Sequence, residues 1–368
     1  MNPNPIRKAF AFGYMLAALA ASSLAVAADD VYRQRNLVSD GTVAAENTDA
    51  NLVNAWGVAF NPFGPVWVAD NGTGVSTLYD GDGKKQPSAQ PLVVQIPPPA
   101  SGSGQGTPTG IVFNASTGFV VSQGGASGPS RFLFATEDGV IAGWAPNVNA
   151  TRAIVAVDNS TRIGAVYKGL ALSAGGNGSL LYAADFRNNR IDVFDSTFKP
   201  VTQTAGAFTD PTLPAGFAPF GLQAISGDIY VSYARQDADK HDDVSGAGLG
   251  YINVFDPNGK LLRRFASQGT LNSPWGMALA PAGFGKFANS LLVGNFGDGR
   301  INAYELASGN FLGQLQGSDQ QPLQINGLWG IAFGNGFQNQ PVDTLFFAAG
   351  PNDEEHGLYG RIDVDTSQ

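Results

Sequence analysis

Both histidines of the chain stand in acidic loops. One loop reads Arg235-Gln236-Asp237-Ala238-Asp239-Lys240-His241-Asp242-Asp243, and the other reads Asn352-Asp353-Glu354-Glu355-His356-Gly357. A histidine beside carboxylates can act as a general base or bind a metal ion. We therefore take His241, Asp242 and Asp239 as candidate catalytic residues, and Arg235, His356 and Glu354 as candidate ligand-binding residues. Solvated polar loops explain the same residues, and this alternative stays open.

Oxygen-bearing side chains recur where β-rich runs end. The candidate metal ligands in these positions are Asp70, Glu137, Asp185 and Asn295. Calcium takes about 6 to 8 oxygen ligands from carboxylates, amides and water, so these residues could hold calcium if the ends of the runs meet. The alternative is that they accept hydrogen bonds from the backbone of the turns that follow, as short polar side chains do.

Large aromatic residues precede recurring glycines in four segments. They are Trp56, Phe220, Trp275 and Trp329. If these segments surround one channel, the rings form an aromatic rim that can stack on a sugar or an aromatic ligand. Packing between neighbouring structural units explains them equally well, because buried aromatic rings commonly fill such interfaces.

Several kinds of chemistry are excluded by what the sequence lacks. It has no cysteine, which excludes thiolate catalysis, Cys-ligated zinc and iron–sulfur clusters. It contains no Gly-x-Ser-x-Gly elbow, His-Glu-x-x-His helix or P-loop. The formal net charge of −9 argues against binding to nucleic-acid phosphates or anionic lipid.

An internal repeat organises the chain around these residues. The segment Asn54-Ala55-Trp56-Gly57-Val58-Ala59-Phe60 recurs five times, with its glycine at positions 110, 169, 221, 276 and 330. Each copy continues with a β-rich run, a loop, a third strand such as Arg190-Ile191-Asp192-Val193-Phe194, and a turn into a fourth. Four antiparallel strands per repeat and six repeats predict an all-β, six-bladed β-propeller. Its loops before the inner strands and those between strands two and three share one face.

The two ends of the chain complement each other. The last repeat stops after its third strand, Arg361-Ile362-Asp363-Val364, and residues 31–39 read as a strand without a repeat of its own. We expect this N-terminal strand to complete the last blade and remove its open edge. Residues 28–368 then form a single domain, which we expect to be monomeric.

The first 27 residues have the pattern of a secretory signal peptide. Arg7 and Lys8 precede the apolar stretch of residues 9–21, and Ala25-Val26-Ala27 fits a signal-peptidase site. A short uncleaved anchor is the alternative, although the stretch falls below the roughly 20 residues that span a bilayer. Later segments are not long and apolar enough to span one. The protein is therefore expected to be secreted or periplasmic.

The repeat resembles that of NHL-type propellers. The pattern of Gly plus an apolar strand, then Ala-Asp, then Arg-Ile-x-Val-Phe-Asp is typical of them. Phrases such as Trp67-Val68-Ala69-Asp70-Asn71-Gly72-Thr73-Gly74 and His241-Asp242-Asp243-Val244 are similar to an uncharacterised family of secreted bacterial propellers. Some members of that family carry a PEP-CTERM sorting tail, and this sequence ends at Gln368 without one. The resemblance implies the fold and leaves the chemistry open.

Two functions fit these observations. The first is a binding protein that recognises a small molecule, glycan or protein through the face with the loops between strands two and three. The second is a metal-dependent hydrolase resembling six-bladed, calcium-using lactonases, with calcium at the channel mouth. Fold alone does not decide between an enzyme and a binding protein.

Overall fold

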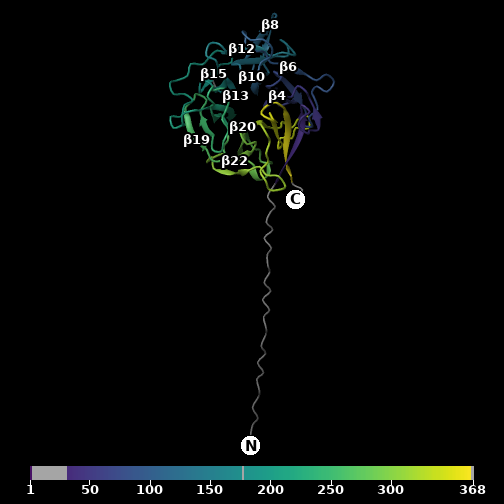
Figure 1. The fold of residues 1–368 in the computed structure, drawn as a ribbon, viewed down its shortest axis with the longest axis vertical. Coiled ribbons are helices and arrows are strands. Elements are labelled where there is room, and N and C mark those ends of the chain that lie inside the picture. Colours follow the sequence, from purple (N-terminus) through teal and green to yellow (C-terminus); the bar gives the residue numbers. More distant parts are fainter. Residues whose placement is uncertain (2–30, 176–177, 366–368) are drawn as a thin grey trace.

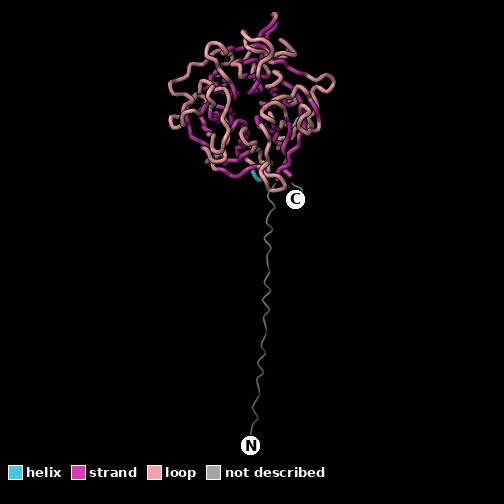
Figure 2. The backbone as a smooth tube through the Cα atoms, viewed as in Figure 1, coloured by secondary structure: helices cyan, strands magenta, loops and turns pink. Residues whose placement is uncertain are grey.

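Six small sheets surround a central axis (Figure 1). The computed structural model describes residue 1, residues 31–175 and residues 178–365. Apart from residue 1, the predicted signal peptide lies outside the described residues. Strands dominate the described chain, and they enclose the centre of the ring while many loops extend at its rim (Figure 2). The predicted six-bladed β-propeller is confirmed.

The blades follow one another along the chain, each beginning with its innermost strand. Blade 1 contains β3 (Ala55–Phe60), β4 (Val66–Asp70), β5 (Val75–Tyr79) and β6 (Val93–Gln95). Blade 2 contains β7 (Pro108–Phe113), β10 (Phe132–Thr136), β11 (Val140–Trp144) and β12 (Ile154–Asp158). Blade 3 contains β13 (Tyr167–Gly175), β14 (Gly178–Asp185) and β15 (Arg190–Phe194).

The second half of the ring repeats this order. Blade 4 contains β16 (Phe217–Ile225), β17 (Asp228–Arg235), β18 (Tyr251–Phe255) and β19 (Leu261–Ser267). Blade 5 contains β20 (Pro274–Leu279), β21 (Ser290–Asn295), β22 (Ile301–Glu305) and β23 (Phe311–Gln314). Blade 6 contains β24 (Leu328–Phe333), β25 (Leu345–Ala349), β26 (Leu358–Asp365), β1 (Val31–Ser39) and β2 (Asn47–Thr48).

The N-terminal strand closes the ring as the sequence predicts. Strand β1 pairs antiparallel with β26, from Val31 opposite Asp365 to Ser39 opposite Leu358. Tyr32 and Val38 are buried, and the Tyr32 hydroxyl donates a hydrogen bond to the carbonyl of Phe284 at 3.2 Å. In Figure 1 the purple and yellow ends of the chain accordingly lie side by side in one blade. The first and last segments therefore share a sheet.

The repeat glycines allow the blades to approach closely around the axis. A Cβ atom on Gly57 would lie 2.5 Å from the carbonyl oxygen of Thr109 in the next blade. One on Gly330 would lie 2.4 Å from the carbonyl oxygen of Trp56, which is the contact between blades 6 and 1. Any side chain at these positions would collide with the neighbouring backbone, which explains why glycine recurs there.

Three blades depart from the predicted four strands, and in blade 6 the two-residue strand β2 adds a fifth beside β1. In blade 3 the fourth strand is reduced to an isolated bridge between Phe194 and Pro200. Blade 2 carries an additional hairpin, β8 (Val120–Gln123) and β9 (Ala126–Pro129), which projects at the rim in Figure 1. A short 3-10 helix, η1 (Gly285–Phe287), lies between β20 and β21. These differences lie away from the inner strands, so they leave the channel unchanged.

Candidate functional site

Aromatic side chains close one end of the central channel, which we call the upper mouth. Trp56 and Trp329 stack with their ring centroids 3.4 Å apart, and each is 1% exposed. Trp275 meets both rings edge-on, and Phe220 lies against Trp329 at 5.7 Å. The four predicted aromatic residues therefore lie together, but as a buried layer. Trp56, Phe220 and Trp329 pack the blades against one another, and Trp275 also lines the narrow part of the channel.

A buried lysine lies beside this aromatic layer. Lys168 directly precedes the glycine of blade 3, so its side chain occupies the ring position that Trp56 occupies in blade 1. The side chain is 2% exposed, and its ammonium bonds Glu137 from blade 2 and Asp242 from blade 4, the latter at 3.1 Å. The same nitrogen lies 5.1 Å from the centre of the Trp56 ring, within cation–π range. Three neighbouring blades are thus joined by one cation.

Glu137 is also held by blade 1. Its Oε2 accepts a hydrogen bond of 2.8 Å from the Asn71 amide, whose oxygen accepts one of 3.3 Å from the Asn54 amide. The Asn54 oxygen in turn accepts a hydrogen bond from Trp56 Nε1 at 3.0 Å. These contacts bring loops that precede inner strands together with loops that follow second strands, as the strand order predicts. Both sets of loops thus share the face of the upper mouth.

Two of the candidate catalytic residues, His241 and Asp242, contact each other. His241 Nδ1 lies 2.9 Å from Asp242 Oδ1, and the two side chains are 38% and 61% exposed. The hydrogen bond to Asp242 raises the pKa of His241, and the contacts with His241 and Lys168 hold the pKa of Asp242 well below its usual range. We call Glu137, Lys168, His241 and Asp242 the charged cluster. The other two predicted residues of this loop, Asp239 and Arg235, are exposed.

Of the two predicted residues in the other loop, one faces the upper mouth. Glu354 Oε1 accepts a hydrogen bond from Trp329 Nε1 at 3.2 Å. Burial, and then the nearby charge of Glu137, raise the pKa of Glu354 to about 7. His356 instead turns toward the segment after β1, where its Nδ1 lies 2.7 Å from Asp40 Oδ2. The two histidines therefore contact different parts of the face.

Three of the four predicted metal ligands bond within their own blades. Asp70 is buried and accepts a hydrogen bond from the Thr77 hydroxyl at 2.9 Å, and burial raises its pKa well above the usual value. Asp185 accepts one from the Asn188 amide at 2.7 Å, and the Asn295 amide donates to the Thr270 carbonyl at 2.8 Å. Glu137 belongs to the charged cluster.

A different set of residues comes together as candidate metal ligands. Among the residues that the structure describes, Glu137, His241 and Asp242 offer ligand atoms within 4.8 Å of one another. The two carboxylates already bond the Lys168 ammonium, however, so a cation of the protein itself stands beside them. A metal ion bound by these residues would therefore lie beside the positive charge of Lys168.

Lys168 is the residue of this site that the sequence analysis did not select. Its signal was present in the aligned repeats, where the residue before the glycine is tryptophan or phenylalanine in four copies, threonine in one and lysine in blade 3. A cation in a ring of inward-facing positions indicates a paired charge, because an unpaired buried ammonium is very costly. The carboxylates that pair with it could not be chosen without knowing how the loops fold.

The fold and this mouth define the class of protein: a six-bladed β-propeller whose channel is closed at one end by aromatic rings beneath a charged cluster. No family model matches the chain. It is 34% identical over 332 residues to the uncharacterized protein R648 of Acanthamoeba polyphaga mimivirus, covering 89% of this chain and 78% of that protein. The uncharacterized protein L690 of the same virus is 32% identical over 333 residues, covering 89% and 84%. The chain belongs to the family of these mimivirus proteins.

Solved structures agree on the fold. A protein of unknown function from Bacteroides thetaiotaomicron superposes with a TM-score of 0.56 at 11% identity, over 91% of this chain and 77% of that one. A glucose dehydrogenase gives a TM-score of 0.53 at 13% identity, over 91% of this chain and 100% of that one. The resemblance to NHL-like propellers is thus confirmed for the fold, while the bacterial and secreted character of the family stays a prediction.

The described part of the chain contains no helix with the length and apolar character needed to span a bilayer.

Proposed function

We propose that this protein is a ligand-binding β-propeller whose upper mouth binds a small polar molecule rich in hydrogen-bond donors, such as an amine or a sugar. The observation that carries the proposal is the burial of Lys168 between Glu137 and Asp242. A buried ion pair is expensive to desolvate, and an apolar side chain of similar size often stabilises a fold as well or better. Four other blades place an aromatic residue at this position, so the charge has a role beyond packing.

The charge balance of the mouth favours a ligand that donates hydrogen bonds. Glu137, Asp242 and Glu354 supply three carboxyl groups, and the ammonium of Lys168 already bonds the first two. Asp242 and His241 remain partly exposed above it. Ammonium or hydroxyl groups of a ligand can therefore donate to the exposed carboxylate of Asp242, and such charge-assisted bonds are stronger than neutral ones.

A metal-dependent hydrolase is the second candidate, because Glu137, His241 and Asp242 could converge on one ion. The position of the Lys168 ammonium makes binding of an organic ligand the better supported function. Because these three residues could bind a metal ion, calcium is included in the binding experiment described below.

Export from the cytoplasm is also part of the proposal. It rests on the basic residues Arg7 and Lys8 and on the apolar stretch that follows them. A fusion of residues 1–30 to a reporter protein, followed by fractionation, would test it.

The binding proposal is tested by titrating the protein with a panel of primary amines, monosaccharides and calcium chloride, using calorimetry. We expect an amine or a sugar to bind, and Glu137→Gln and Asp242→Asn each to weaken it about 10- to 100-fold, since a hydrogen bond to a charged group contributes about 1.5–3 kcal/mol. Glu305→Gln removes a charge from an exposed residue on β22 and is the matched control. Equal affinity in all three variants would contradict the proposal, and tight binding of calcium alone would favour the hydrolase.

A further inference from the structure

The lower half of the channel, at the end opposite the charged cluster, is a cavity whose lining residues are apolar apart from Gln223, with polar backbone groups exposed between their side chains. Its volume is about 430 Å³, and all six inner strands line it. The side chains nearest its opening are Phe60, Phe113, Leu172, Leu279 and Phe333. Toward the repeat glycines the channel narrows to a space of about 50 Å³. Small-molecule sites typically have volumes of about 300–1,000 Å³, and the volume of this cavity falls in that range.

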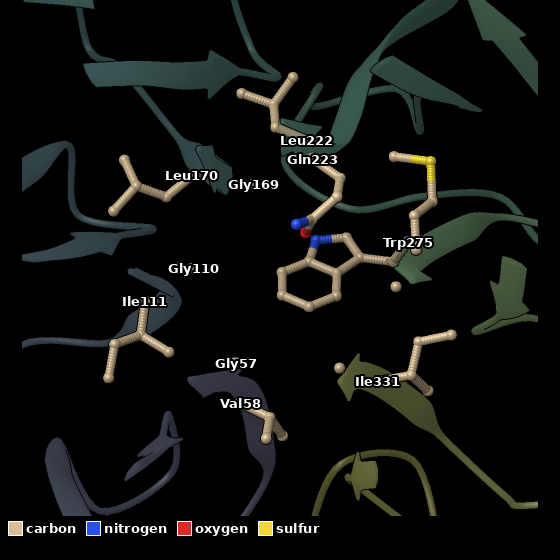
Figure 3. Close-up of a pocket in the computed structure, with 13 residues that line it drawn as sticks. Gly57, Val58, Gly110, Ile111, Gly169, Leu170, Leu222, Gln223, Trp275 and Ile331 are labelled. Carbon is tan, nitrogen blue, oxygen red and sulfur yellow. The ribbon is translucent and has the colours of Figure 1, made fainter. Parts of the chain in front are cut away.

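The inner end of this cavity is closed by Trp275. Figure 3 shows its indole extending into the space enclosed by Gly57, Gly110 and Gly169. The residue is 8% exposed, and within the described residues its Nε1 has no hydrogen-bond partner. By contrast, Trp56, Trp144 and Trp329 each donate a hydrogen bond from Nε1. A buried donor without a partner is unfavourable, so this N–H is suited to an acceptor that enters the channel.

Gln223 supplies a second polar group at the same place. It lines both the narrow and the wide part of the channel. In the projection of Figure 3 its side-chain amide overlaps the indole of Trp275, and both residues line the narrow part of the channel, although no hydrogen bond joins them among the described residues. An amide offers both donors and an acceptor. The residues that line the wide cavity are otherwise apolar, with no charged side chain among them in the described chain.

We propose that the lower channel binds an uncharged, mostly apolar molecule that carries a carbonyl or hydroxyl oxygen at one end. The oxygen accepts a hydrogen bond from Trp275 Nε1 and bonds the Gln223 amide, while the apolar body lies against residues such as Ile111, Met277 and Ile331. A charged ligand is excluded because it would lose its hydration without gaining a counter-ion. This site lies at the opposite end of the channel from the charged cluster, so it does not depend on the function proposed above.

The test uses three probes of similar size on the whole protein: acetophenone, which has a carbonyl acceptor, cumene, which has none, and benzoate, which is charged. Binding is followed by tryptophan fluorescence and by the melting temperature. We expect acetophenone to bind several-fold more tightly than cumene, since one neutral hydrogen bond contributes about 0.5–1.5 kcal/mol. Benzoate should not bind. No response to any probe at millimolar concentration would overturn the proposal.

Substitutions then locate the site. Trp275→Phe keeps an aromatic ring but removes the N–H, so acetophenone should lose about 3- to 10-fold in affinity and its preference over cumene should disappear. Gln223→Leu should also lower the affinity for acetophenone and its preference over cumene. Because Gln223 lines the channel, this variant tests the same site if Trp275→Phe folds poorly. Trp144→Phe is the matched control, because Trp144 is also 8% exposed but lies in blade 2. An unchanged preference in the first two variants would place the bound probe elsewhere and contradict the proposal.

Discussion

At the scale of single residues, Glu354 gives the upper mouth a measurable response to pH. Its carboxyl is largely buried beside Glu137, and its pKa is raised to about 7, against about 4.3 in an unfolded chain. The folded state therefore binds a proton that the unfolded state releases. The protonated Glu354 carboxyl therefore contributes its full stability to the folded state below about pH 4, and this contribution to the free energy of unfolding is lost as the pH rises toward 7.

This shift predicts that Glu354→Gln becomes more stable than the wild type as the pH rises. Glutamine resembles the protonated acid and can still accept the hydrogen bond from Trp329. Melting temperatures should be similar at pH 4, and the variant should melt higher at pH 8. The difference is less than about 1.4 kcal/mol per pH unit, because the carboxyl is partly solvated. Glu355→Gln, at an exposed neighbour, is the control. A difference that does not change with pH would contradict the assignment.

Residue types alone predicted part of this mouth. The acidic loops identified His241, Asp242 and Glu354, which do lie at the upper mouth, because such loops follow second strands in a regular repeat. Their partners were not predictable, because Lys168 meets Glu137 and Asp242 only when three blades come together. The contact of His356 with Asp40 was not predictable either, because it depends on the path of the chain after β1.

At the scale of elements, strand β1 is the part of the fold on which closure depends. Val31, Tyr32, Leu37 and Val38 are buried, and β1 covers the edge of β26. At roughly 1.5–3 kcal/mol for each fully buried side chain, its loss should cost several kcal/mol. A chain that begins at residue 40 should therefore melt well below one that begins at residue 29, and it should aggregate through its open edge.

A peptide of residues 29–40 offers a further check on this closure. Added in excess, it should raise the melting temperature of the shortened chain, since a ligand that binds only the folded state stabilises it. Equal melting temperatures of the two chains would show that β1 is dispensable. The sequence predicted this strand because the last repeat lacked one. It did not predict the missing fourth strand of blade 3, where the chain after Phe194 forms a single bridge at Pro200.

At the scale of the whole molecule, the glycine ring couples the blades. An added Cβ atom would lie 2.4 Å from the carbonyl oxygen of Trp329 at Gly276, and 2.4 Å from that of Trp56 at Gly330. The first contact joins consecutive blades, whereas the second joins blades 6 and 1, which come from opposite ends of the chain. Equal spacing at both contacts indicates that the closing contact is as tight as an internal one.

The last prediction follows from this equality. Gly276→Ala and Gly330→Ala should lower the melting temperature by similar amounts, because each forces two inner strands apart by the same distance, and overpacking of this kind typically costs about 1–3 kcal/mol. Gly283→Ala is the control, since its Cβ atom would meet the exposed side chain of Asp343 at 3.3 Å. Each variant should unfold in one transition when followed by calorimetry. A much smaller effect at Gly330 would mean that the ring is looser where it closes, and two separate transitions would show that the blades do not unfold as one unit.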